Sequence, residues 1–348
     1  MSHMSAKPRL DLSIIIVSWN VRDLLRDCLR SLLASPRVRF DGVPDAAPLA
    51  AESASPTRAL NSVSPLTAEI IVVDNGSADG SPAMVATGFP WVALVSNPVN
   101  RGFTGGNNQG LERSRGEYIL FLNPDTVVVE DALAGMVAYM RDHPEVGGVG
   151  PQLRYGDGSM QSSRRRFPTL MMALFESTPI AWHWPRNPWA RRYHMDDVLG
   201  RSDVGGTEYV DWVVGAALMV RRSALDQVGG FDEGFFMYSE EVDWCRRAAD
   251  TGWRMAYLPA AQVIHYEGKS SEQVVSARHI RFQTSRVRYF RKHRGLAAAE
   301  MLRVCLLGMF AFEWALEAAK WIAGSRRSLR RARLSAYGQL LREMSVSG

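Results

Sequence analysis

Cysteine is scarce in this sequence, with only 3 among 348 residues, and Cys28, Cys245 and Cys305 lie far apart. An odd number of widely spaced cysteines excludes a disulfide framework and a structural zinc motif, and it is typical of a reducing compartment. The N-terminus also lacks the basic and then apolar pattern of a secretory signal peptide. We therefore expect a cytoplasmic protein.

Two common phosphate-binding signatures are absent as well. The glycine-rich segment 100–110 matches neither the Rossmann fingerprint nor the P-loop, and no lysine follows its glycines. No basic loop follows the first apolar run, where Val17-Ser-Trp-Asn20 stands. These absences argue against a nucleotidyltransferase-like enzyme, which we keep as an alternative function.

The charge balance is basic, with a formal net charge of +5. This suits an anionic partner such as a nucleotide diphosphate or a lipid headgroup. A non-catalytic polysaccharide- or nucleic-acid-binding protein is a second alternative. However, the arginines at 164–166 lack the interleaved aromatic residues of a nucleic-acid surface, so we expect no nucleic acid partner.

Three apolar runs rich in β-branched or aromatic residues, at 12–17, 69–73 and 118–122, predict strands buried on both faces. Helical patterns follow at 22–33 and around 79–87. This alternation predicts an α/β fold with a doubly wound, mainly parallel sheet.

Other segments are less regular. We expect further strands at 209–220 and 254–265, an irregular excursion at 160–210 over the site, and helices from 276 onward. The segment 36–67, rich in alanine, proline and serine, predicts an exposed, flexible insertion.

Polar residues stand where each of the first three predicted strands ends. Ligands of doubly wound sheets bind beyond the carboxyl ends of the strands. Three polar strand ends therefore predict a nucleotide pocket, to which the amides and glycines of segment 100–110 would contribute by close backbone approach. The candidate residues are Ser18, Asn20, Asp74, Asn75, Asn100, Gly102, Asn107, Asn123 and Asp125.

Asp125 and His265 are the candidate metal ligands. A carboxylate at a strand end in a phosphate site suits Mg²⁺ or Mn²⁺, and a neutral imidazole at the end of strand 254–265 could complete the metal shell. The alternatives are a capping aspartate and a structural histidine, and Asp74 could likewise cap a turn.

Three carboxylates, Glu240, Glu241 and Asp243, stand within four residues at the expected start of a helix. A helix N-terminus stabilises negative charge, which keeps a carboxylate ready to accept a proton. The alternative is a capping box with solvated acids. The cluster predicts a general base whose identity among the three stays open.

Taken together, these motifs resemble the family 2 inverting glycosyltransferases of the GT-A fold, and especially the bacterial rhamnosyltransferase-like branch. The resemblance covers roughly residues 12–290. The segments that carry it are Ser13–Asn20, Ile71–Ser77, Asn100–Gly110, Leu120–Asp125, Gly229–Met237, Ser239–Arg246 and Val263–Ser270.

The resemblance implies a role for individual residues. Asp74 would bind the base or ribose of the donor, and Asn100 and Asn107 would line its pocket. Asn123-Pro-Asp125 stands where the family has its Asp-x-Asp metal motif, so Asp125 would contact the metal. Glu241 stands at the family's usual base position, with a Glu where Asp is typical, so Glu240 and Asp243 stay alternatives. His265 would contact the metal or the diphosphate.

The resemblance also implies an activity. An inverting displacement would move a sugar, with rhamnose favoured, from a nucleotide-diphosphate donor to a hydroxyl group. The favoured donor would be dTDP-rhamnose, with a UDP-sugar or a GDP-sugar as alternatives, and Mg²⁺ or Mn²⁺ would be the cofactor. The acceptor would be a glycan or a polyprenyl-linked sugar in cell-surface polysaccharide synthesis.

The expected organisation is a GT-A domain at 12–275, containing the insertion 36–67, followed by a helical C-terminal region at 276–348. Charges interrupt the apolar run 302–323, which argues against a spanning helix. An amphipathic helix on the inner face of the bacterial cytoplasmic membrane, flanked by arginines, fits better. The alternative is packing on its own domain or on a second subunit.

Overall fold

The computed structural model describes residues 10–43, 65–176, 178, 184, 187–196, 206–266, 275–324 and 326–346. The chain divides into two units. The sheet unit comprises residues 1–165, 198–233 and 241–270, and the helical unit comprises residues 166–197, 234–240 and 271–348. The predicted division into a GT-A domain at 12–275 and a helical region at 276–348 stays a prediction.

The described part of the sheet unit is built on one large sheet, in which the strand order is β10-β13-β7-β12-β5-β1-β3-β2. Strands β4, β6 and β8 pair with β3, β13 and β7, and β9 and β11 form a separate pair. The strands are β1 Leu10–Ser18, β2 Val38–Phe40, β3 Leu66–Asp74, β4 Ala93–Ser96, β5 Gly116–Leu122, β6 Thr126–Val129, β7 Val146–Arg154, β8 Met160–Gln161, β9 Arg164–Arg165, β10 Glu208–Val210, β11 Trp212–Val213, β12 Ala217–Arg221 and β13 Arg254–His265.

The sheet confirms the predicted α/β fold and refines it. β1, β2, β3, β4 and β5 pair in parallel, whereas β12 runs antiparallel between β5 and β7. The strand predicted at 254–265 is β13. The strand predicted at 209–220 is wrong as a single element: the chain turns at 214–216, so that β12 is a separate strand.

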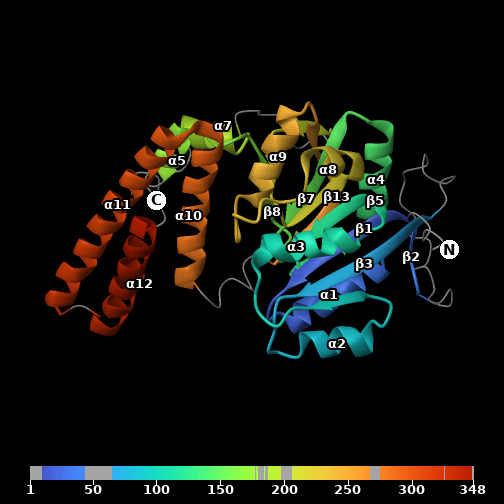
Figure 1. Cartoon of the computed structure of the whole chain (residues 1–348), viewed down its shortest axis with the longest axis horizontal. Coiled ribbons are helices and arrows are strands. Elements are labelled where there is room, and N and C mark those ends of the chain that lie inside the picture. Colours follow the sequence, from blue (N-terminus) through green and yellow to red (C-terminus); the bar gives the residue numbers. More distant parts are fainter. Residues whose placement is uncertain are drawn as a thin grey trace, which may run out of the picture. The chain divides into compact units, whose positions relative to one another are not determined.

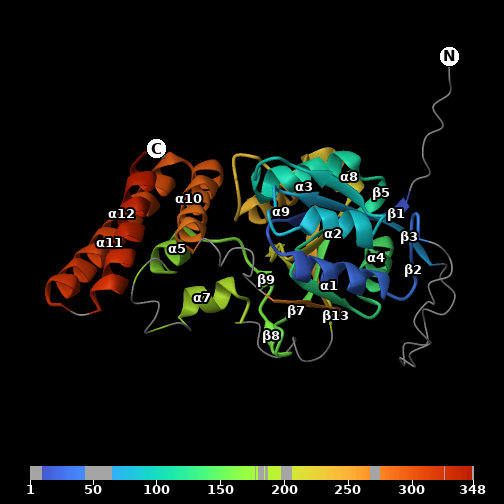
Figure 2. The same cartoon turned by 90° about the horizontal axis from the view of Figure 1, so that it is seen from below.

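Helices cover both faces of the sheet, as Figures 1 and 2 show. The inward side chains of β1 alternate: Ile14 and Ile16 join a core with Leu25 of α1 and Met136 of α4, whereas Ile15 faces α3. The helices of this unit are α1 Arg22–Leu33, α2 Ser81–Gly88, α3 Gly102–Arg113, α4 Ala132–Asp142, α8 Arg222–Val228 and α9 Glu240–Asp250. The first residue of α9, Glu240, is counted with the helical unit.

The glycine-rich segment 100–110 does not precede a helix but forms most of α3 itself. A Cβ added to Gly110 would stand 2.4 Å from Ile15 Cγ2, and one added to Gly106 would stand 2.8 Å from Val17 Cγ1. The glycines therefore let α3 lie directly on β1. This tertiary contact outweighs the low helix propensity of glycine.

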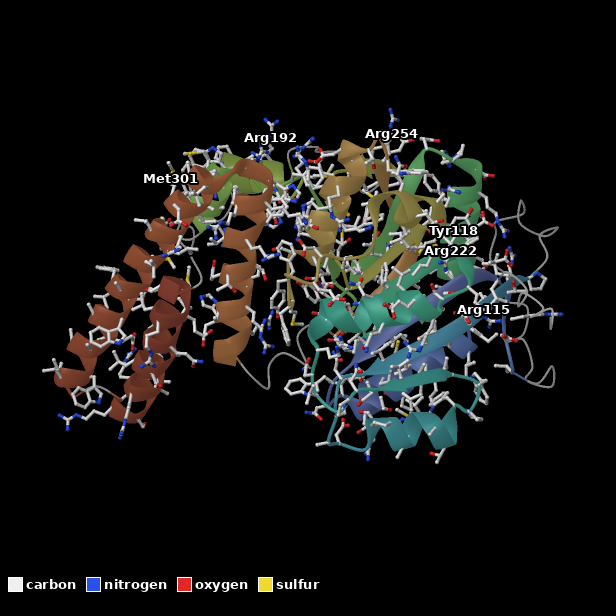
Figure 3. The ribbon with its side chains drawn as sticks, viewed as in Figure 1. Arg115, Tyr118, Arg192, Arg222, Arg254 and Met301 are labelled. Carbon is white, nitrogen blue, oxygen red and sulfur yellow. The ribbon has the colours of Figure 1, made fainter. Side chains whose placement is uncertain are left out.

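A buried polar network anchors the opposite, amino end of the parallel strands. Ser13 Oγ donates to Glu69 Oε1 at 2.7 Å and accepts from the Gly116 N–H at 2.7 Å. Arg115 Nε donates to Glu69 Oε2 at 2.9 Å, and Arg222 Nε donates to the Gly116 carbonyl at 2.6 Å (Figure 3). These bonds join β1, β3 and β5 across three strands.

Both ends of the segment predicted as an insertion, 36–67, belong to the sheet. Val38–Phe40 forms β2, which pairs with the start of β3 at Leu66. Residues 44–64, the larger part of that segment, lie outside the described residues.

The helical unit contains three long helices, α10 Val275–Arg294, α11 Leu296–Ile322 and α12 Arg327–Val346, which pack against one another (Figure 1). Two short helices, α5 Leu170–Glu176 and α7 Pro188–Tyr193, come from the segment predicted to be irregular. None of the helices in the described ranges combines the length and the hydrophobicity that a bilayer crossing requires.

Of the charges that interrupt the apolar run 302–323, Glu317 is buried within the helical unit. Glu317 is only 3% exposed and accepts from Arg330 Nη1 at 2.6 Å, with Arg333 at 3.4 Å and Lys320 at 3.7 Å. The hydrogen bond from Arg330 is the main reason that the pKa of Glu317 lies below its ordinary value. The side of α11 that carries Glu317 therefore packs within the helical unit, as the alternative to membrane contact predicted.

We predict that Gly110→Ala destabilises the protein although alanine favours helices. Overpacking against Ile15 costs about 1–3 kcal/mol. The matched control is Gly135→Ala in α4, where an added Cβ meets nothing within 4 Å. That change should stabilise by up to about 1 kcal/mol. Urea unfolding of both variants measures the difference, and equal effects would contradict the packing of α3.

Candidate active site

The carboxyl ends of β1 and β3 lie side by side, because Ser18 pairs with Asp74 in the parallel register. Helix α3 crosses this edge, since a Cβ on Gly106 would approach both Val17 and the Asn75 amide. Ser18, Asp74 and Asn107 of α3 are all buried. The structure thus brings together three of the residues predicted to bind a donor.

Each of these three side chains has a polar atom without a hydrogen-bond partner among the described residues. The atoms are Ser18 Oγ, Asp74 Oδ1 and Asn107 Oδ1. A buried polar atom left unpaired costs roughly 1–3 kcal/mol, so most are paired in folded proteins. Three of them at one sheet edge indicate a ligand site.

Other predicted donor residues bond within the protein. Asn20 Oδ1 accepts from the Ala78 N–H at 2.8 Å, and Asn100 Oδ1 accepts from the Gly102 N–H at 2.8 Å. Asn75 donates to the Gly102 carbonyl at 2.8 Å. Gly102 itself has φ +81°, which favours glycine. These residues shape the loops around the edge.

Asn123, Asp125 and His265 meet at the end of β5. β6 pairs antiparallel with β13, and this pairing brings His265 opposite Thr126. His265 Nε2 lies 3.4 Å from Asp125 Oδ1 and 3.4 Å from Asn123 Nδ2, and both Asp125 and His265 are buried. The two predicted metal ligands are therefore neighbours, although they are 140 residues apart in sequence (265 − 125).

Gln161 of β8 orients this histidine, a role that sequence reasoning missed. Its Oε1 lies 3.1 Å from His265 Nδ1. With the proton on Nδ1 donated to Gln161, the Nε2 lone pair faces the Asp125 carboxylate. Two acceptors at this distance suit a cation between them, and metal-binding histidines commonly donate their other ring nitrogen in this way.

The pair fits a divalent cation only in part. Within the described ranges, no group of three or more His, Cys, Asp and Glu side chains could hold a metal ion. Mg²⁺ and similar ions are commonly held by one or two carboxylates together with substrate phosphates and water. Asp125 and His265 therefore suit a cation whose remaining ligands come with the substrate.

Glu241 lies in the first turn of α9, beside Gly215, where an added Cβ would stand 3.4 Å from the Glu241 Cδ. The next residue, Ala216, accepts a hydrogen bond from the Asn123 N–H at 2.9 Å, so this carboxylate shares the edge of Asn123. Glu241 Oε2 is buried and has no partner in the described part of the chain. Burial raises the pKa of Glu241, and nearby backbone groups offset this in part.

The other two carboxylates of the cluster have different surroundings. Asp243 is fully buried and pairs with Arg247 Nε at 2.9 Å, while Arg247 also donates to the carbonyls of Val228 and Gly230. Asp243 is therefore a structural ion-pair partner. Glu240 is a buried residue at the first position of α9.

Two consecutive residues before α9 have left-handed backbones, a feature with no clear mark in the sequence. Tyr238 has φ 71° and Ser239 has φ 65°. Residues other than glycine rarely adopt this conformation, and such strain gathers at functional sites. The backbone thus turns sharply immediately ahead of the carboxylates.

Comparison with known proteins agrees with this geometry. The profile of glycosyl transferase family 2 matches residues 50–207, and that of glycosyl transferase family 21 matches residues 203–344. Over 213 residues the chain is 33% identical to the N-acetylglucosaminyl-diphospho-decaprenol L-rhamnosyltransferase of Mycobacterium tuberculosis, covering 58% of this chain and 67% of that protein. The chain belongs to glycosyl transferase family 2.

A second relative supports the rhamnosyltransferase-like branch of the family. The chain is 28% identical to the rhamnosyltransferase WbbL of Escherichia coli K12 over 196 residues, which cover 54% of this chain and 67% of WbbL. Membership of the family decides for a glycosyltransferase, and against both the nucleotidyltransferase and the non-catalytic binding protein.

Solved structures support the GT-A fold of this family 2 glycosyltransferase. A mannosyltransferase from Pyrobaculum calidifontis, in complex with GDP-Man and Mn²⁺, aligns with a TM-score of 0.53 at 19% identity, covering 98% of this chain and 87% of that one. GalNAc-T7, with UDP, GalNAc and Mn²⁺, aligns with a TM-score of 0.51 at 14% identity, covering 82% and 48%.

We predict that Glu241→Gln stabilises the family 2 glycosyltransferase at neutral pH. The folded-state pKa of Glu241 is raised, so its ionisation favours the unfolded chain, and a neutral glutamine removes this cost. The gain should be present at about pH 7–8 and vanish below the ordinary pKa of glutamate, where both states are protonated.

Thermal unfolding across this pH range measures the effect. Glu112→Gln is the control, since it removes an exposed glutamate of α3 and should leave the melting temperature nearly unchanged. A variant less stable than the wild type at neutral pH would show that the Glu241 carboxylate is a stabilising group.

Proposed function

We propose that the protein is an inverting, metal-dependent rhamnosyltransferase whose acceptor is a sugar linked to a lipid through a diphosphate. Buried polar atoms without partners among the described residues gather at the carboxyl ends of β1 and β3. Together with the likeness to two rhamnosyltransferases, this observation supports the proposal. The acceptor class comes from the name of the mycobacterial relative, which specifies a diphospho-decaprenol.

The proposed donor site lies at the ends of β1 and β3. Asp74 Oδ1 would accept from the base or ribose, and Ser18 and Asn107 would contact the nucleoside beside it. Asp74 Oδ2 already accepts from the Gly76 and Ser77 N–H groups at 3.1 and 2.9 Å, so the free oxygen is held in a defined direction. We propose a dTDP-sugar as the donor of this rhamnosyltransferase, and a UDP-sugar or a GDP-sugar is the alternative.

Asp125 and His265 are the proposed metal ligands. A bound Mg²⁺ or Mn²⁺ would offset the negative charge that develops on the departing nucleoside diphosphate. Gln161 holds the His265 ring in position through Nδ1, and the Asn123 side-chain amide nitrogen lies 3.4 Å from Nε2. Two solved structures of similar fold contain Mn²⁺, which supports the use of a divalent cation.

Glu241 is the proposed general base. Its unpartnered Oε2 is free to accept the proton of the acceptor hydroxyl as that oxygen attacks the anomeric carbon. The raised pKa brings the carboxylate closer to the operating pH, which strengthens it as a base. The ion pair with Arg247 makes Asp243 a weak candidate, and Glu240 stays the alternative.

A nucleotide-binding experiment tests the proposal. We expect the wild type to bind dTDP more tightly than UDP or GDP in the presence of Mn²⁺, measured by calorimetry. Asp125→Asn should weaken Mn²⁺-dependent binding at least 10-fold because the carboxylate contact with the cation is lost. Asp226→Asn, on the exposed side of α8, is the control and should bind normally.

The outcome separates the parts of the proposal. Preference for UDP or GDP would refute the dTDP donor, and cation-independent binding of any of these nucleotides would refute the role of Asp125. Well-folded protein that binds no nucleotide would refute the donor site itself.

The helical unit is the proposed membrane-facing part. Met301, Val304, Phe312 and Ile322 of α11 are 56–72% exposed, and at about 100° per residue they share about a quarter of the helix surface. This side lies opposite the buried stripe through Leu302 and Leu306. The exposed Arg326, Arg327 and Arg331 nearby suit anionic headgroups.

We predict that the protein sediments with vesicles of phosphatidylglycerol. Phe312→Ser combined with Ile322→Ser should reduce vesicle binding several-fold, since both exposed apolar side chains would be lost. Val99→Ser, an exposed apolar residue of the sheet unit, is the control. Unchanged binding by the double variant would rule out this face of α11 as the membrane contact.

A further inference from the structure

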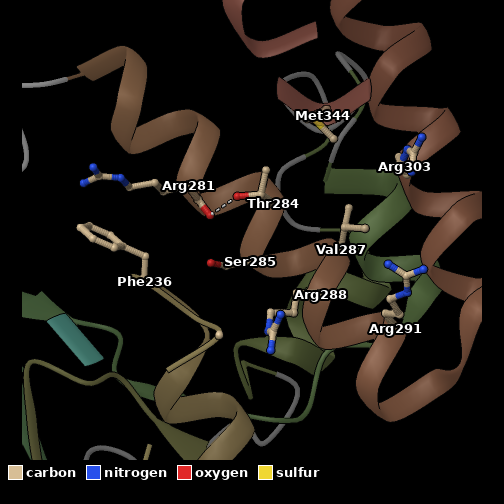
Figure 4. A pocket seen from close by; sticks show the side chains of 10 residues that line it. Phe236, Arg281, Thr284, Ser285, Val287, Arg288, Arg291, Arg303 and Met344 are labelled. Carbon is tan, nitrogen blue, oxygen red and sulfur yellow. Dashed lines mark hydrogen bonds between the residues drawn. The ribbon is translucent and has the colours of Figure 1, made fainter. Parts of the chain in front are cut away.

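The cavity of the helical unit, about 250 Å³ in volume, does not direct its charged groups to one point. The Arg281 guanidinium lies over the Phe236 ring, 4.1 Å from the ring centroid, whereas Arg291 lies at the opposite side of the cavity (Figure 4). Groups arranged in this way do not converge on one small ligand. A further ligand site is better supported within the sheet unit, beside the proposed cation site.

Tyr266 is an exposed aromatic residue next to the proposed metal ligands. It follows His265 in the chain, and its N–H donates to the Asp125 carbonyl at 2.9 Å, which continues the antiparallel pairing of β6 with β13. Hydrogen-bonded partners in such a pair have Cα atoms about 5.5 Å apart. The Tyr266 side chain therefore begins beside Asp125, and the residue is 40% exposed.

Gly156, in the turn between β7 and β8, supports the tyrosine ring. A Cβ added to Gly156 would stand 2.6 Å from Tyr266 Cε1 and 2.8 Å from Cδ1, so the ring lies directly on the glycine backbone. Arg154 Nη1 holds this turn by donating to the Gly158 carbonyl at 2.9 Å. A ring held in this way is preorganised, which lowers the entropic cost of binding a ligand.

Met160 of β8 widens the apolar surface. Ile264 pairs with Arg154, and Arg154 pairs with Met160, so these three residues share one face of the sheet. Tyr266 stands two residues after Ile264, which places it on the same face. Met160 is 50% exposed. Tyr266 and Met160 thus form an apolar surface that is open to solvent, and we call it the Tyr266 platform.

The strand order places the Tyr266 platform on the far side of the cation site from the nucleoside site. The proposed nucleoside site lies at the ends of β1 and β3, and Asp125 follows the end of β5. In the sheet, β7 and β13 lie on the side of β5 away from β1 and β3. A nucleotide sugar is linear, with its diphosphate between the nucleoside and the sugar. A donor whose diphosphate lies at Asp125 therefore carries its sugar toward Tyr266.

We propose that the sugar of the donor packs on the Tyr266 platform. The inference rests on the proposed function, because it assigns a site to the sugar of that donor. One face of a sugar ring carries C–H groups, which an aromatic ring can cover while the hydroxyl groups keep other partners. Rhamnose has a methyl group where most hexoses have a hydroxymethyl group, and this methyl suits an apolar neighbour such as Met160.

Calorimetry with the full-length protein and Mn²⁺ tests the platform by comparing dTDP with dTDP-rhamnose. Tyr266→Ala should weaken the binding of dTDP-rhamnose about 5-fold, because the sugar loses the aromatic surface. The affinity for dTDP should stay unchanged, since dTDP has no sugar to reach the ring. Tyr266→Phe keeps the ring and should bind both ligands as the wild type does.

Two further variants accompany this comparison. Tyr209→Ala is the matched control, because it removes a tyrosine of similar exposure, 48%, from the edge strand β10, and it should bind both ligands normally. Gly156→Ala places a Cβ where the tyrosine ring lies, so it should weaken the binding of dTDP-rhamnose alone. Circular dichroism and the melting temperature establish that each variant is folded.

The outcomes separate the platform from the function on which it rests. Equal weakening of dTDP and dTDP-rhamnose by Tyr266→Ala overturns the inference, because the ring would then serve the nucleotide. Normal binding of dTDP-rhamnose by this variant also overturns it, and a KM raised only for the acceptor would assign the ring to the acceptor instead. A wild type that binds neither ligand refutes the proposed donor, and the platform for its sugar with it.

Discussion

The site depends on one constraint, the parallel register that brings the carboxyl ends of β1, β3 and β5 to the same edge of the sheet. Ser18 pairs with Asp74, and Ile16 pairs with Leu122, so the polar residues that follow these strands emerge at one edge. At the other end of the strands, Ser13, Glu69 and Arg115 lock the register through buried hydrogen bonds. A shift of one residue would turn every side chain of a strand to the opposite face, and would disperse the site.

Two close backbone contacts, of α3 with β1 and of β6 with β13, bring the remaining residues of the site together. The glycines of α3 let that helix lie against β1, which carries Asn107 to the strand ends. The antiparallel pairing of β6 with β13 brings His265 beside Asp125, and β8 supplies Gln161 behind the ring. Ser18, Asp74, Asn107, Gln161 and His265 are placed by strands or a helix, and Asp125 by the short turn between β5 and β6, so these side chains have the little freedom that preorganised binding of a charged substrate requires.

Burial has opposite effects on the stability of the fold at two carboxylates of α9. Asp243 is buried against Arg247 and is compensated, so it supports the fold. Glu241 is two residues away, and its Oε2 has no partner in the described part of the protein, so its charge disfavours the folded state. Stability given up at one carboxylate and kept at its neighbour is expected where a site must hold a reactive group.

The sequence alone determined the α/β class, the strands of the parallel half and their polar ends, because apolar β-branched runs and turn residues act locally. It also marked Asp125, His265 and the cluster at 240–243 as candidates. Several features needed the tertiary structure: α3 as a glycine-rich helix, the division of 209–220 and the pairing of His265 with Gln161. The structure also decided which carboxylate of the cluster is compensated by an ion pair. These depend on contacts between residues far apart in the chain, and no local pattern encodes such contacts.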